Sequence, residues 1–221
     1  MLVKNYMTEN VITVGETDSL LQTIETMRGT RHRSLPVVDD LKRVLGLISE
    51  KEVNRACPAD INMLSRQEAN SLLGRFKVKN LMRKDVALLH MEDSVEFAAY
   101  QFYKYDYPSF PVVDKDNRLV GIISKKDIFR AFIEIMAMNR PCTRFTIETP
   151  DKVGVVAELA TLFKDEDINI LSLVPRVLPN GTATINIRAD LQNQGLGIVG
   201  KITDAGYKVI DVANYEGVDE Q

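Results

Sequence analysis

Short apolar runs separated by polar turns dominate the first part of the chain. Residues 110–113 and 119–123 are apolar and flank a polar stretch. Two apolar runs of this length around a turn predict a β-hairpin with buried strands. Ser124 follows the second run, with Asp127 three positions later, and this spacing is typical of a helix N-terminus. Residues 107–131 are therefore predicted to form a strand, a turn, a second strand and the start of a helix.

The same pattern occurs twice. Displacing the chain by 75 residues aligns residues 3–56 with residues 78–131 without a gap, and nineteen of the fifty-four aligned positions are identical. Identity at this level without gaps indicates an internal duplication, so we infer a repeated unit of roughly sixty residues. Clearly matching segments are Pro36–Asp39 with Pro111–Asp114 and Gly46–Ser49 with Gly121–Ser124.

Each copy is predicted to have the element order β-α-β-β-α, because apolar runs alternate with segments of helical periodicity. The elements expected in the first copy are a strand at 11–14, a helix at 18–27, strands at 34–39 and 43–48, and a helix from residue 49. The second copy follows the same order, and its first helix, after Ser94, is rich in aromatic side chains.

Residues 57–77 interrupt the repeat. Ser65 and Glu68 have the spacing of a capping box and lead into Leu72 and Leu73, so one short helix is expected there. We interpret the segment as a packed connection between the copies, with an interaction surface as the alternative.

After residue 138 the pattern changes, and residues 139–142 are expected to be a domain boundary. The predicted elements that follow are strands at 144–149, 168–178, 182–189 and 207–212 and helices at 155–164 and 196–205. Pro179-Asn180-Gly181 supplies a hairpin turn between the second and third strands. The order β-α-β-β-α-β is that of the ferredoxin-like split unit. The fold class expected for the whole chain is therefore α+β.

The composition is that of an ordinary soluble protein of 221 residues with a formal net charge of −3. This charge gives no general attraction to nucleic acid or to an anionic membrane. The N-terminal residues lack the apolar core of a signal peptide, and no apolar run has the length of a membrane span. The two cysteines, Cys57 and Cys142, have no metal-ligand spacing and suit a reducing compartment. We expect a cytoplasmic protein that binds neither nucleic acid nor membrane.

No segment resembles a catalytic motif. The chain has no phosphate-binding loop of the Lys-Ser/Thr type, no nucleophile elbow and no metal-ligand spacing. Two histidines in the whole chain leave little for general acid–base catalysis. The pattern favours binding over turnover, with an enzyme that uses carboxylates as a remaining alternative.

The duplicated unit resembles a tandem of cystathionine-β-synthase (CBS) domains, known as a Bateman module. The resemblance rests on Ser-Leu-Pro-Val-Val-Asp and Ser-Phe-Pro-Val-Val-Asp, and on Gly-x-Ile-Ser-x-x-acid in both copies. The C-terminal part resembles an ACT domain through Asp151–Gly154 and Ile168–Ile170. A CBS pair followed by an ACT domain is similar to the acetoin-utilization regulatory protein family. The implied domains are CBS domain 1 at 1–56, a connection at 57–77, CBS domain 2 at 78–136 and the ACT domain at 143–217.

The resemblance implies two clefts for an adenosine-containing ligand such as AMP, ADP, ATP or S-adenosylmethionine. In each cleft the acid at a helix start accepts the ribose hydroxyl groups, and residues of the other copy frame the adenine or meet phosphate. Carried onto this chain, the first cleft comprises Met7, Ile12, His32, Arg33, Ser124 and Asp127. The second cleft comprises Ser49, Glu52, Met82, Ala87, Tyr107 and Pro108.

The first cleft is expected to be the better site. A short carboxylate such as Asp127 suits a ribose diol, and charge-assisted hydrogen bonds are the stronger kind. The positive end of the helix and the Arg31–Arg33 segment would favour phosphate. In the second cleft Glu52 is longer than the acid of the family pattern, and Tyr107-Pro108 replaces the cations. The alternative is that Ser124 and Asp127 form only a capping box, which needs no ligand.

For the C-terminal domain the resemblance implies a candidate amino-acid site. The matching positions are Asp151, Gly154, Val155, Asn169 and Ile170. Val153 stands where the family usually has proline, and the alternative is a domain that serves only in dimerisation. The chain is therefore expected to be a non-catalytic regulatory sensor and a homodimer, linked by its resemblance to acetoin utilization. The alternative function is an oligomerisation or adaptor module with vestigial clefts.

Overall fold

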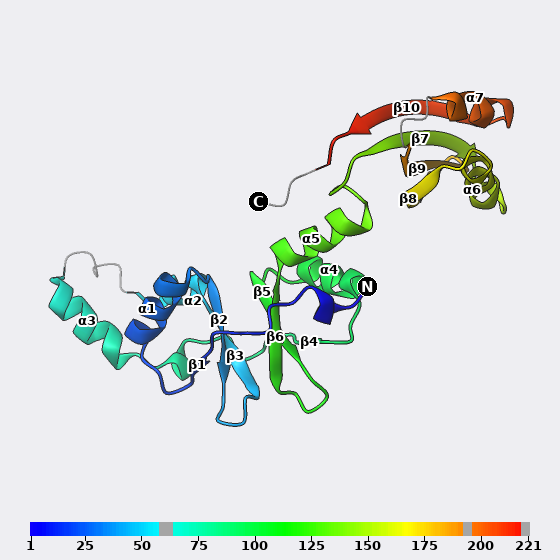
Figure 1. Ribbon diagram of the computed structural model, residues 1–221. Helices are drawn as coiled ribbons and strands as arrows, with labels where there is room; N and C mark the ends of the chain where they lie inside the picture. The colour runs from blue at the N-terminus through cyan, green and yellow to red at the C-terminus, as the bar shows by residue number, and fades with distance from the viewer. Residues whose placement is uncertain (58–63, 192–195, 218–221) are drawn as a thin grey trace. The chain divides into compact units, whose positions relative to one another are not determined.

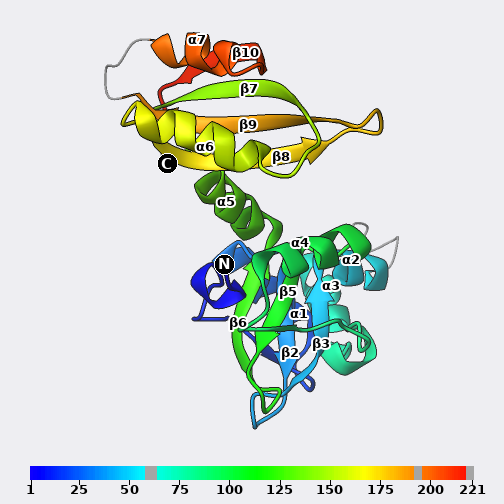
Figure 2. The ribbon, with the colours of Figure 1, turned by 90° about the vertical axis from the view of Figure 1, so that its right-hand side faces the viewer.

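The computed structural model describes residues 1–57, 64–191 and 196–217. The chain divides into two compact units, Met1–Phe129 and Arg130–Gln221, and each unit is described by itself. Figure 1 and Figure 2 show the elements of both units from two sides.

The first repeat contains a three-stranded sheet in the order β1-β2-β3. Its elements are η1 (Val3–Asn5), β1 (Val14–Gly15), α1 (Leu20–Thr30), β2 (Ser34–Val38), β3 (Val44–Ser49) and α2 (Glu50–Ala56). The predicted order is confirmed, but the strand expected at 11–14 was placed too early. Only Val14 and Gly15 pair with β2, since the preceding residues are not part of the sheet.

The second repeat has the same elements and the sheet order β4-β5-β6. They are η3 (Val78–Asn80), β4 (Leu89–His90), α4 (Val95–Lys104), β5 (Ser109–Val113), β6 (Leu119–Ser124) and α5 (Lys125–Ile135). The hairpins β2–β3 and β5–β6 lie side by side in both views (Figures 1 and 2). The helix predicted in the connection is α3 (Arg66–Arg75), and the capping box of Ser65 with Glu68 is present. Residues 58–63 of the predicted connection lie outside the described residues.

Paired backbone contacts join the two repeats at the same 75-residue offset. Thr8 and Ile122 exchange two backbone hydrogen bonds of 2.9 Å. Leu47 and Arg83, the equivalent residues, exchange bonds of 3.0 and 2.9 Å. Since each contact has a counterpart in which the two repeats change roles, the repeats are related by a pseudo-twofold axis.

The start of each repeat packs on the other repeat. The N–H of Val3 donates to the carbonyl of Asp93 at 2.8 Å, and the N–H of Val78 donates to the carbonyl of Asp18 at 3.0 Å. Val3 and Val78 are both completely buried. The apolar core around α1 therefore includes Val78, and each repeat is completed by a segment of the other.

A methionine of each repeat packs on a glycine of the other. A Cβ atom at Gly121 would overlap Sδ of Met7, and one at Gly46 would lie 2.5 Å from the carbonyl oxygen of Arg83 and 2.9 Å from Sδ of Met82. Contacts this short leave no room for a side chain. Glycine at these two positions allows a segment of one repeat to approach the other repeat closely.

The second unit is an antiparallel sheet in the order β10-β7-β9-β8. Its elements are β7 (Cys142–Pro150), α6 (Val155–Asp165), β8 (Asn169–Val177), β9 (Thr182–Asp190), α7 (Gly197–Asp204) and β10 (Lys208–Tyr215). The predicted order β-α-β-β-α-β is confirmed. The last strand was expected at 207–212 but continues to Tyr215, because its pairing with β7 runs on to Cys142.

Both helices of the second unit contribute to one apolar core with one face of the sheet. Phe145 and Ile187 from the sheet, Leu159 and Phe163 from α6 and Ile202 from α7 are fully buried in this core. The alternation of buried and partly exposed residues along β7 and β9 fits a sheet with helices on a single face.

Candidate functional site

The first predicted cleft begins at the N-terminus of α5. The N–H and the hydroxyl group of Ser124 donate to Oδ2 of Asp127 at 2.8 and 2.6 Å, and the Asp127 N–H is 3.4 Å from Oγ of Ser124. This is the capping geometry that the local sequence predicts. It fixes the Asp127 carboxylate at the edge of the cleft, beside the positive end of the helix.

The opposite wall comes from the first repeat and is rich in cations. Arg31 and Arg33 follow α1 with His32 between them, and Lys126 adds a cation from α5. The cleft has a volume of about 450 Å³, within the usual range for small-molecule sites. Thr8 also lines this cleft. The arrangement combines one carboxylate at a helix start with several cations across the cleft.

The structure brings four of the six residues predicted for the first cleft into its lining. His32, Arg33, Ser124 and Asp127 line it. Met7 packs against Gly121 and Ile12 packs against the core of the first repeat, so neither is among the lining residues. The local sequence could not exclude them, because both are apolar residues close to Thr8 in the chain.

The second predicted cleft is smaller, with a volume of about 280 Å³. Four of the residues predicted for it are in its lining, namely Ser49, Glu52, Tyr107 and Pro108. Met82 packs against Gly46. Ala87 is partly buried between η3 and β4, and it is not among the lining residues either.

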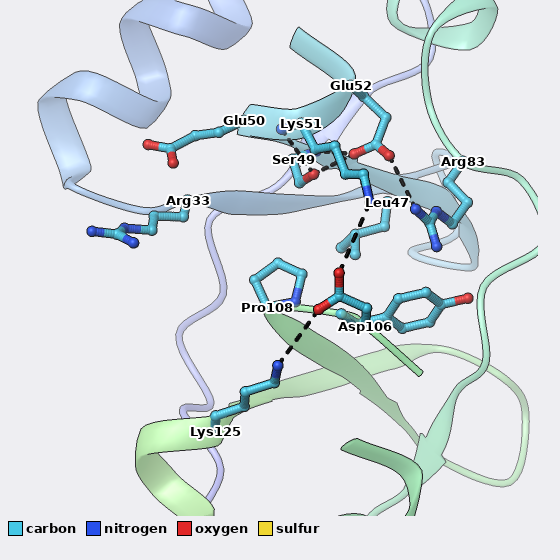
Figure 3. Close-up of a pocket in the computed structure, with 11 residues that line it drawn as sticks. Arg33, Leu47, Ser49, Glu50, Lys51, Glu52, Arg83, Asp106, Pro108 and Lys125 are labelled. Atoms are coloured by element: carbon cyan, nitrogen blue, oxygen red, sulfur yellow. Dashed lines mark hydrogen bonds and ion pairs between the residues drawn. The ribbon is translucent and has the colours of Figure 1, made fainter. Parts of the chain in front are cut away.

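Side chains of the second cleft are engaged with one another. Nη2 of Arg83 lies 3.3 Å from Oε1 of Glu52, and the Arg83 guanidinium lies over the Tyr107 ring at 4.8 Å. Asp106 lies between Lys51 and Lys125, at 3.9 and 3.8 Å from their ammonium groups. Figure 3 shows Glu52 and Arg83 pointing toward each other, whereas Arg33 points away from this cluster.

The charge on Glu52 is stabilised by these contacts. Burial acts to raise its pKa, but hydrogen bonds from Ser49 and Arg83 outweigh burial and hold the pKa below its usual value. The Ser49 hydroxyl donates to Oε2 and Arg83 donates to Oε1. Both oxygens of the carboxylate are therefore used within the protein.

Position by position, the clefts differ where the two repeats differ. Thr8 in the first cleft corresponds to Arg83 in the second, and Asp127 corresponds to Glu52. Further pairs of equivalent positions are Arg31 with Asp106, His32 with Tyr107 and Arg33 with Pro108. The sequence interpretation did not include Thr8, Lys126 or Arg83. The alignment of the two repeats could have identified Arg83. It places this long cationic side chain at the position of the small Thr8, next to the predicted site residues Met7 and Met82.

The residues predicted for an amino-acid site lie in two separate places. Asp151, Gly154 and Val155 follow β7, and Gly154 has a positive φ of 100° at the N-terminus of α6. Asn169 and Ile170 begin β8, where Asn169 is opposite Asp190, whereas Ala183 at the other end of β9 is opposite Thr149. The two groups are thus separated by most of the length of the sheet, roughly 20 Å. Within one chain they do not form a single pocket.

The described part of the chain comprises residues 1–57, 64–191 and 196–217. These residues contain no cluster of three or more His, Cys, Asp or Glu side chains placed to hold a metal ion. They also contain no helix with the length and apolar character needed to cross a membrane.

The two repeats match a known domain family. The family model of the CBS domain matches residues 3–59 and 78–134, together more than half of the chain. The chain belongs to the CBS-domain family, and the matched segments are the two repeats.

Among solved structures, the chain is similar to CBSX2, a CBS-pair protein from Arabidopsis thaliana. The identity is 25% with a TM-score of 0.55, covering 62% of this chain and 96% of that one. A crystal structure of CBSX2 in complex with AMP matches at 24% identity and a TM-score of 0.51, which shows a shared fold. A putative acetoin utilization protein (AcuB) from Vibrio cholerae is 26% identical with a TM-score of 0.51, covering 62% of this chain and 94% of that one.

An uncharacterized protein of Methanocaldococcus jannaschii is 30% identical over 134 residues. This match covers 60% of the present chain and 44% of the archaeal protein. The chain therefore spans less than half the length of this curated relative.

Proposed function

We propose that this protein is a cytoplasmic, non-catalytic regulatory sensor that binds an adenine nucleotide or a related adenosine ligand in the first cleft. The observation that carries the proposal is the placement of Asp127 in one cleft with Arg31, His32 and Arg33. Asp127 would accept the ribose hydroxyl groups, and the arginines would bind phosphate. The complex of CBSX2 with AMP is a precedent for this fold, and the case for this chain rests on its own residues.

Each part of such a ligand has a matching group. A carboxylate accepts two hydroxyl groups of a ribose through charge-assisted hydrogen bonds. The start of α5 offers a positive dipole end near the cleft, which favours an anion. Arginine binds phosphate through paired N–H groups with a geometry that lysine lacks. We therefore expect AMP, ADP or ATP to bind more tightly than uncharged adenosine.

Isothermal titration calorimetry of the full chain with adenosine, AMP, ADP, ATP and S-adenosylmethionine tests this proposal. The expected result is saturable binding of at least one adenine nucleotide, weakened by Asp127→Ala. A ligand at about 100 times its dissociation constant should also raise the free energy of unfolding by roughly 2.7 kcal/mol. If none of these compounds binds, the sensor proposal fails and the adaptor interpretation is favoured.

The second cleft supports a different role. Because Arg83 contacts both Glu52 and Tyr107, we propose that the binding groups of this cleft are occupied by one another and that it holds no ligand. One ligand would then bind per CBS pair. The second cleft would then be vestigial, as the adaptor interpretation holds for both clefts. Its side-chain contacts would hold the two repeats together and would not bind a ligand.

We propose that the second unit is an ACT domain, supported by its order β-α-β-β-α-β and its single helical face. The separation of Asp151–Val155 from Asn169 and Ile170 favours a role in dimerisation over an amino-acid pocket within one chain. A homodimer is part of this proposal.

The likeness to the Vibrio cholerae protein is what supports a link to acetoin utilization. Growth of a deletion strain on acetoin tests that link.

A further inference from the structure

A further cavity adjoins the first cleft on the side of α1 and α2. It has a volume of about 610 Å³, and Arg31, His32 and Arg33 line both this cavity and the first cleft. We call this cavity the helix groove; its further lining residues include Ile24, Met27 and Arg28 of α1 and Glu50, Val53 and Asn54 of α2. A ligand bound across the three shared residues can therefore reach into both spaces.

The helix groove has an apolar floor and a polar rim. Met27 and Val53 are buried, and Ile24 is partly buried. Glu50 and Asn54 are exposed on α2 at the rim. An apolar surface bordered by a few groups that form hydrogen bonds is the usual environment of a bound small molecule.

The charged side chains around the helix groove are not paired within the part of the chain that the structure describes. No hydrogen bond or ion pair there engages the guanidinium groups of Arg28, Arg31 and Arg33. The same is true of the Glu50 carboxylate. Figure 3 shows Arg33 and Glu50 pointing to the same side, away from the cluster in the second cleft. The unpaired arginines attract phosphate, and the unpaired carboxylate is available to accept hydroxyl groups.

The two repeats differ at the polar positions of the helix groove. The residues equivalent to Arg28, Arg31, Glu50 and Asn54 are Tyr103, Asp106, Lys125 and Phe129. Each charge at these positions is reversed or lost in the second repeat, and an aromatic ring stands in place of the amide. The duplication has therefore diverged here, and the first repeat alone combines these cations with a carboxylate and an amide.

We propose that the helix groove is a second nucleoside site, so that the ligand of the first cleft is a dinucleotide, two nucleosides joined through their 5′-phosphates. This inference rests on the sensor proposal and adds the class of ligand. Adenosine lies in the first cleft with its ribose on Asp127, and the phosphates lie on Arg31 and Arg33. Glu50 accepts the hydroxyl groups of the second ribose. The second base lies on the apolar floor, where the amide of Asn54 bonds to its polar edge.

A nucleoside fits the helix groove better than an acyl or pantetheine chain does. The first cleft combines a carboxylate with cations, and the groove repeats this combination in Glu50 and Arg28. A ribose diol uses a carboxylate as an acceptor of two hydrogen bonds. An apolar chain has no pair of hydroxyl groups to donate to a carboxylate at the rim.

Ligands that share adenosine 5′-diphosphate isolate each part of the second nucleoside. Isothermal titration calorimetry of the full chain compares ADP with ADP-ribose, which adds a ribose, and with diadenosine diphosphate, which also adds a base. Diadenosine diphosphate should bind at least about tenfold more tightly than ADP, since a hydrogen bond to a charged group contributes this much. ADP-ribose should lie between them. Diadenosine tetraphosphate, with ATP as its charge-matched control, tests a longer phosphate bridge.

Two variants test the helix groove itself through the ratio of the affinities for diadenosine diphosphate and ADP. Glu50→Gln should lower this ratio about tenfold, because the acceptor of the second ribose loses its charge. Asn54→Phe, which introduces the residue of the second repeat, should bring the ratio close to one by filling the groove. Arg55→Phe is the matched control: this neighbouring residue of α2 is exposed and is not among the lining residues, so the ratio should not change.

The outcomes separate this inference from the sensor proposal. If ADP does not bind, both are overturned. If ADP binds but neither dinucleotide binds more tightly than its control, or if Glu50→Gln leaves the ratio unchanged, only the second nucleoside site is overturned. Dephospho-coenzyme A carries a pantetheine chain in place of the second nucleoside, and an equal gain over ADP for this compound also overturns the site. Circular dichroism checks folding, and Glu50→Gln decides the question if Asn54→Phe is unfolded.

Discussion

The hydroxyl groups of Ser34 and Ser109 lie 2.7 Å apart in a hydrogen bond between residues 75 positions apart in the chain. The pseudo-twofold axis passes through this contact, because the two serines are equivalent positions of the repeats. Arg33 and Pro108, which precede them, are also equivalent, and both residues line both clefts. The two clefts are thus neighbours at the pseudo-twofold axis. They share Arg33 and Pro108 and differ in their other lining residues.

The first prediction concerns the ribose acceptor. Asp127→Ala should weaken adenine-nucleotide binding by about 1.5–3 kcal/mol, the range for a hydrogen bond to a charged group. The cap at Ser124 is lost as well, so calorimetric affinity and not the melting temperature is the measurement. Glu52→Ala in the second cleft is the matched control and should leave the affinity nearly unchanged. If Glu52→Ala abolishes binding and Asp127→Ala does not, the ranking of the clefts is reversed.

Phosphate recognition is tested separately with Arg33. Arg33→Ala should weaken the binding of AMP and ATP but hardly change that of adenosine, because only the phosphates need the cation. Arg55→Ala is a suitable control, since this exposed arginine of α2 is not among the lining residues of either cleft. An equal loss for adenosine and AMP would show that Arg33 does not act on phosphate.

Arg31 should show opposite effects on stability and on binding. It ends α1 with a positive φ of 58°, a conformation that glycine adopts more readily. Arg31→Gly is therefore expected to raise the free energy of unfolding by about 1 kcal/mol while weakening AMP binding. Urea denaturation and calorimetry on the same variant measure the two effects. A loss of stability would contradict the strain argument.

Acid should destabilise the second cleft through Glu52. Its pKa is lowered in the folded state from 4.5, so its stabilising contribution is present above pH 4.5 and is lost as the pH falls through the lower folded value. Glu52→Gln should cost about 1–3 kcal/mol at pH 7 and should make the decline in stability between pH 5 and pH 3 shallower. Urea denaturation across this range, with the exposed Glu50→Gln as control, measures the difference. If the free energy of unfolding depends on pH in the same way in wild type and Glu52→Gln, ionised Glu52 does not stabilise the fold.

A methyl group at either glycine of the repeat contact should destabilise the fold, but truncating the methionine packed on it should rescue only one of the two variants. Gly121→Ala and Gly46→Ala should each lower the free energy of unfolding by about 1–3 kcal/mol through overpacking. Met7→Ala should partly rescue Gly121→Ala, because the closest atom is in the Met7 side chain. Met82→Ala should not rescue Gly46→Ala, since the Arg83 carbonyl lies at 2.5 Å. Gly29→Ala in α1, with open space around it, is the control and should stabilise by about 0.5–1 kcal/mol.

Local sequence determined most of the element order. Ser19, Ser49 and Ser65 cap helices through hydrogen bonds to the next turn, and such bonds depend only on residues within a few positions. The strand hairpins follow from apolar runs around turns, and the duplication shows in an ungapped alignment. The resemblance to CBS pairs then led to Ser124, Asp127, His32 and Arg33, which the structure brings into one cleft.

Tertiary structure decided which further side chains line each cleft and which predicted ones do not. Arg83 reaches Glu52 across 31 positions of the chain, and Val3 is buried beside Asp93 of the other repeat. Met7 was assigned to the site from sequence, yet it packs on Gly121. Such contacts depend on how the repeats cross, and helical or strand periodicity reports only which face of an element is apolar. Which residues of one repeat face the other repeat is set by the tertiary packing. The difference between the two clefts therefore follows only from the folded structure.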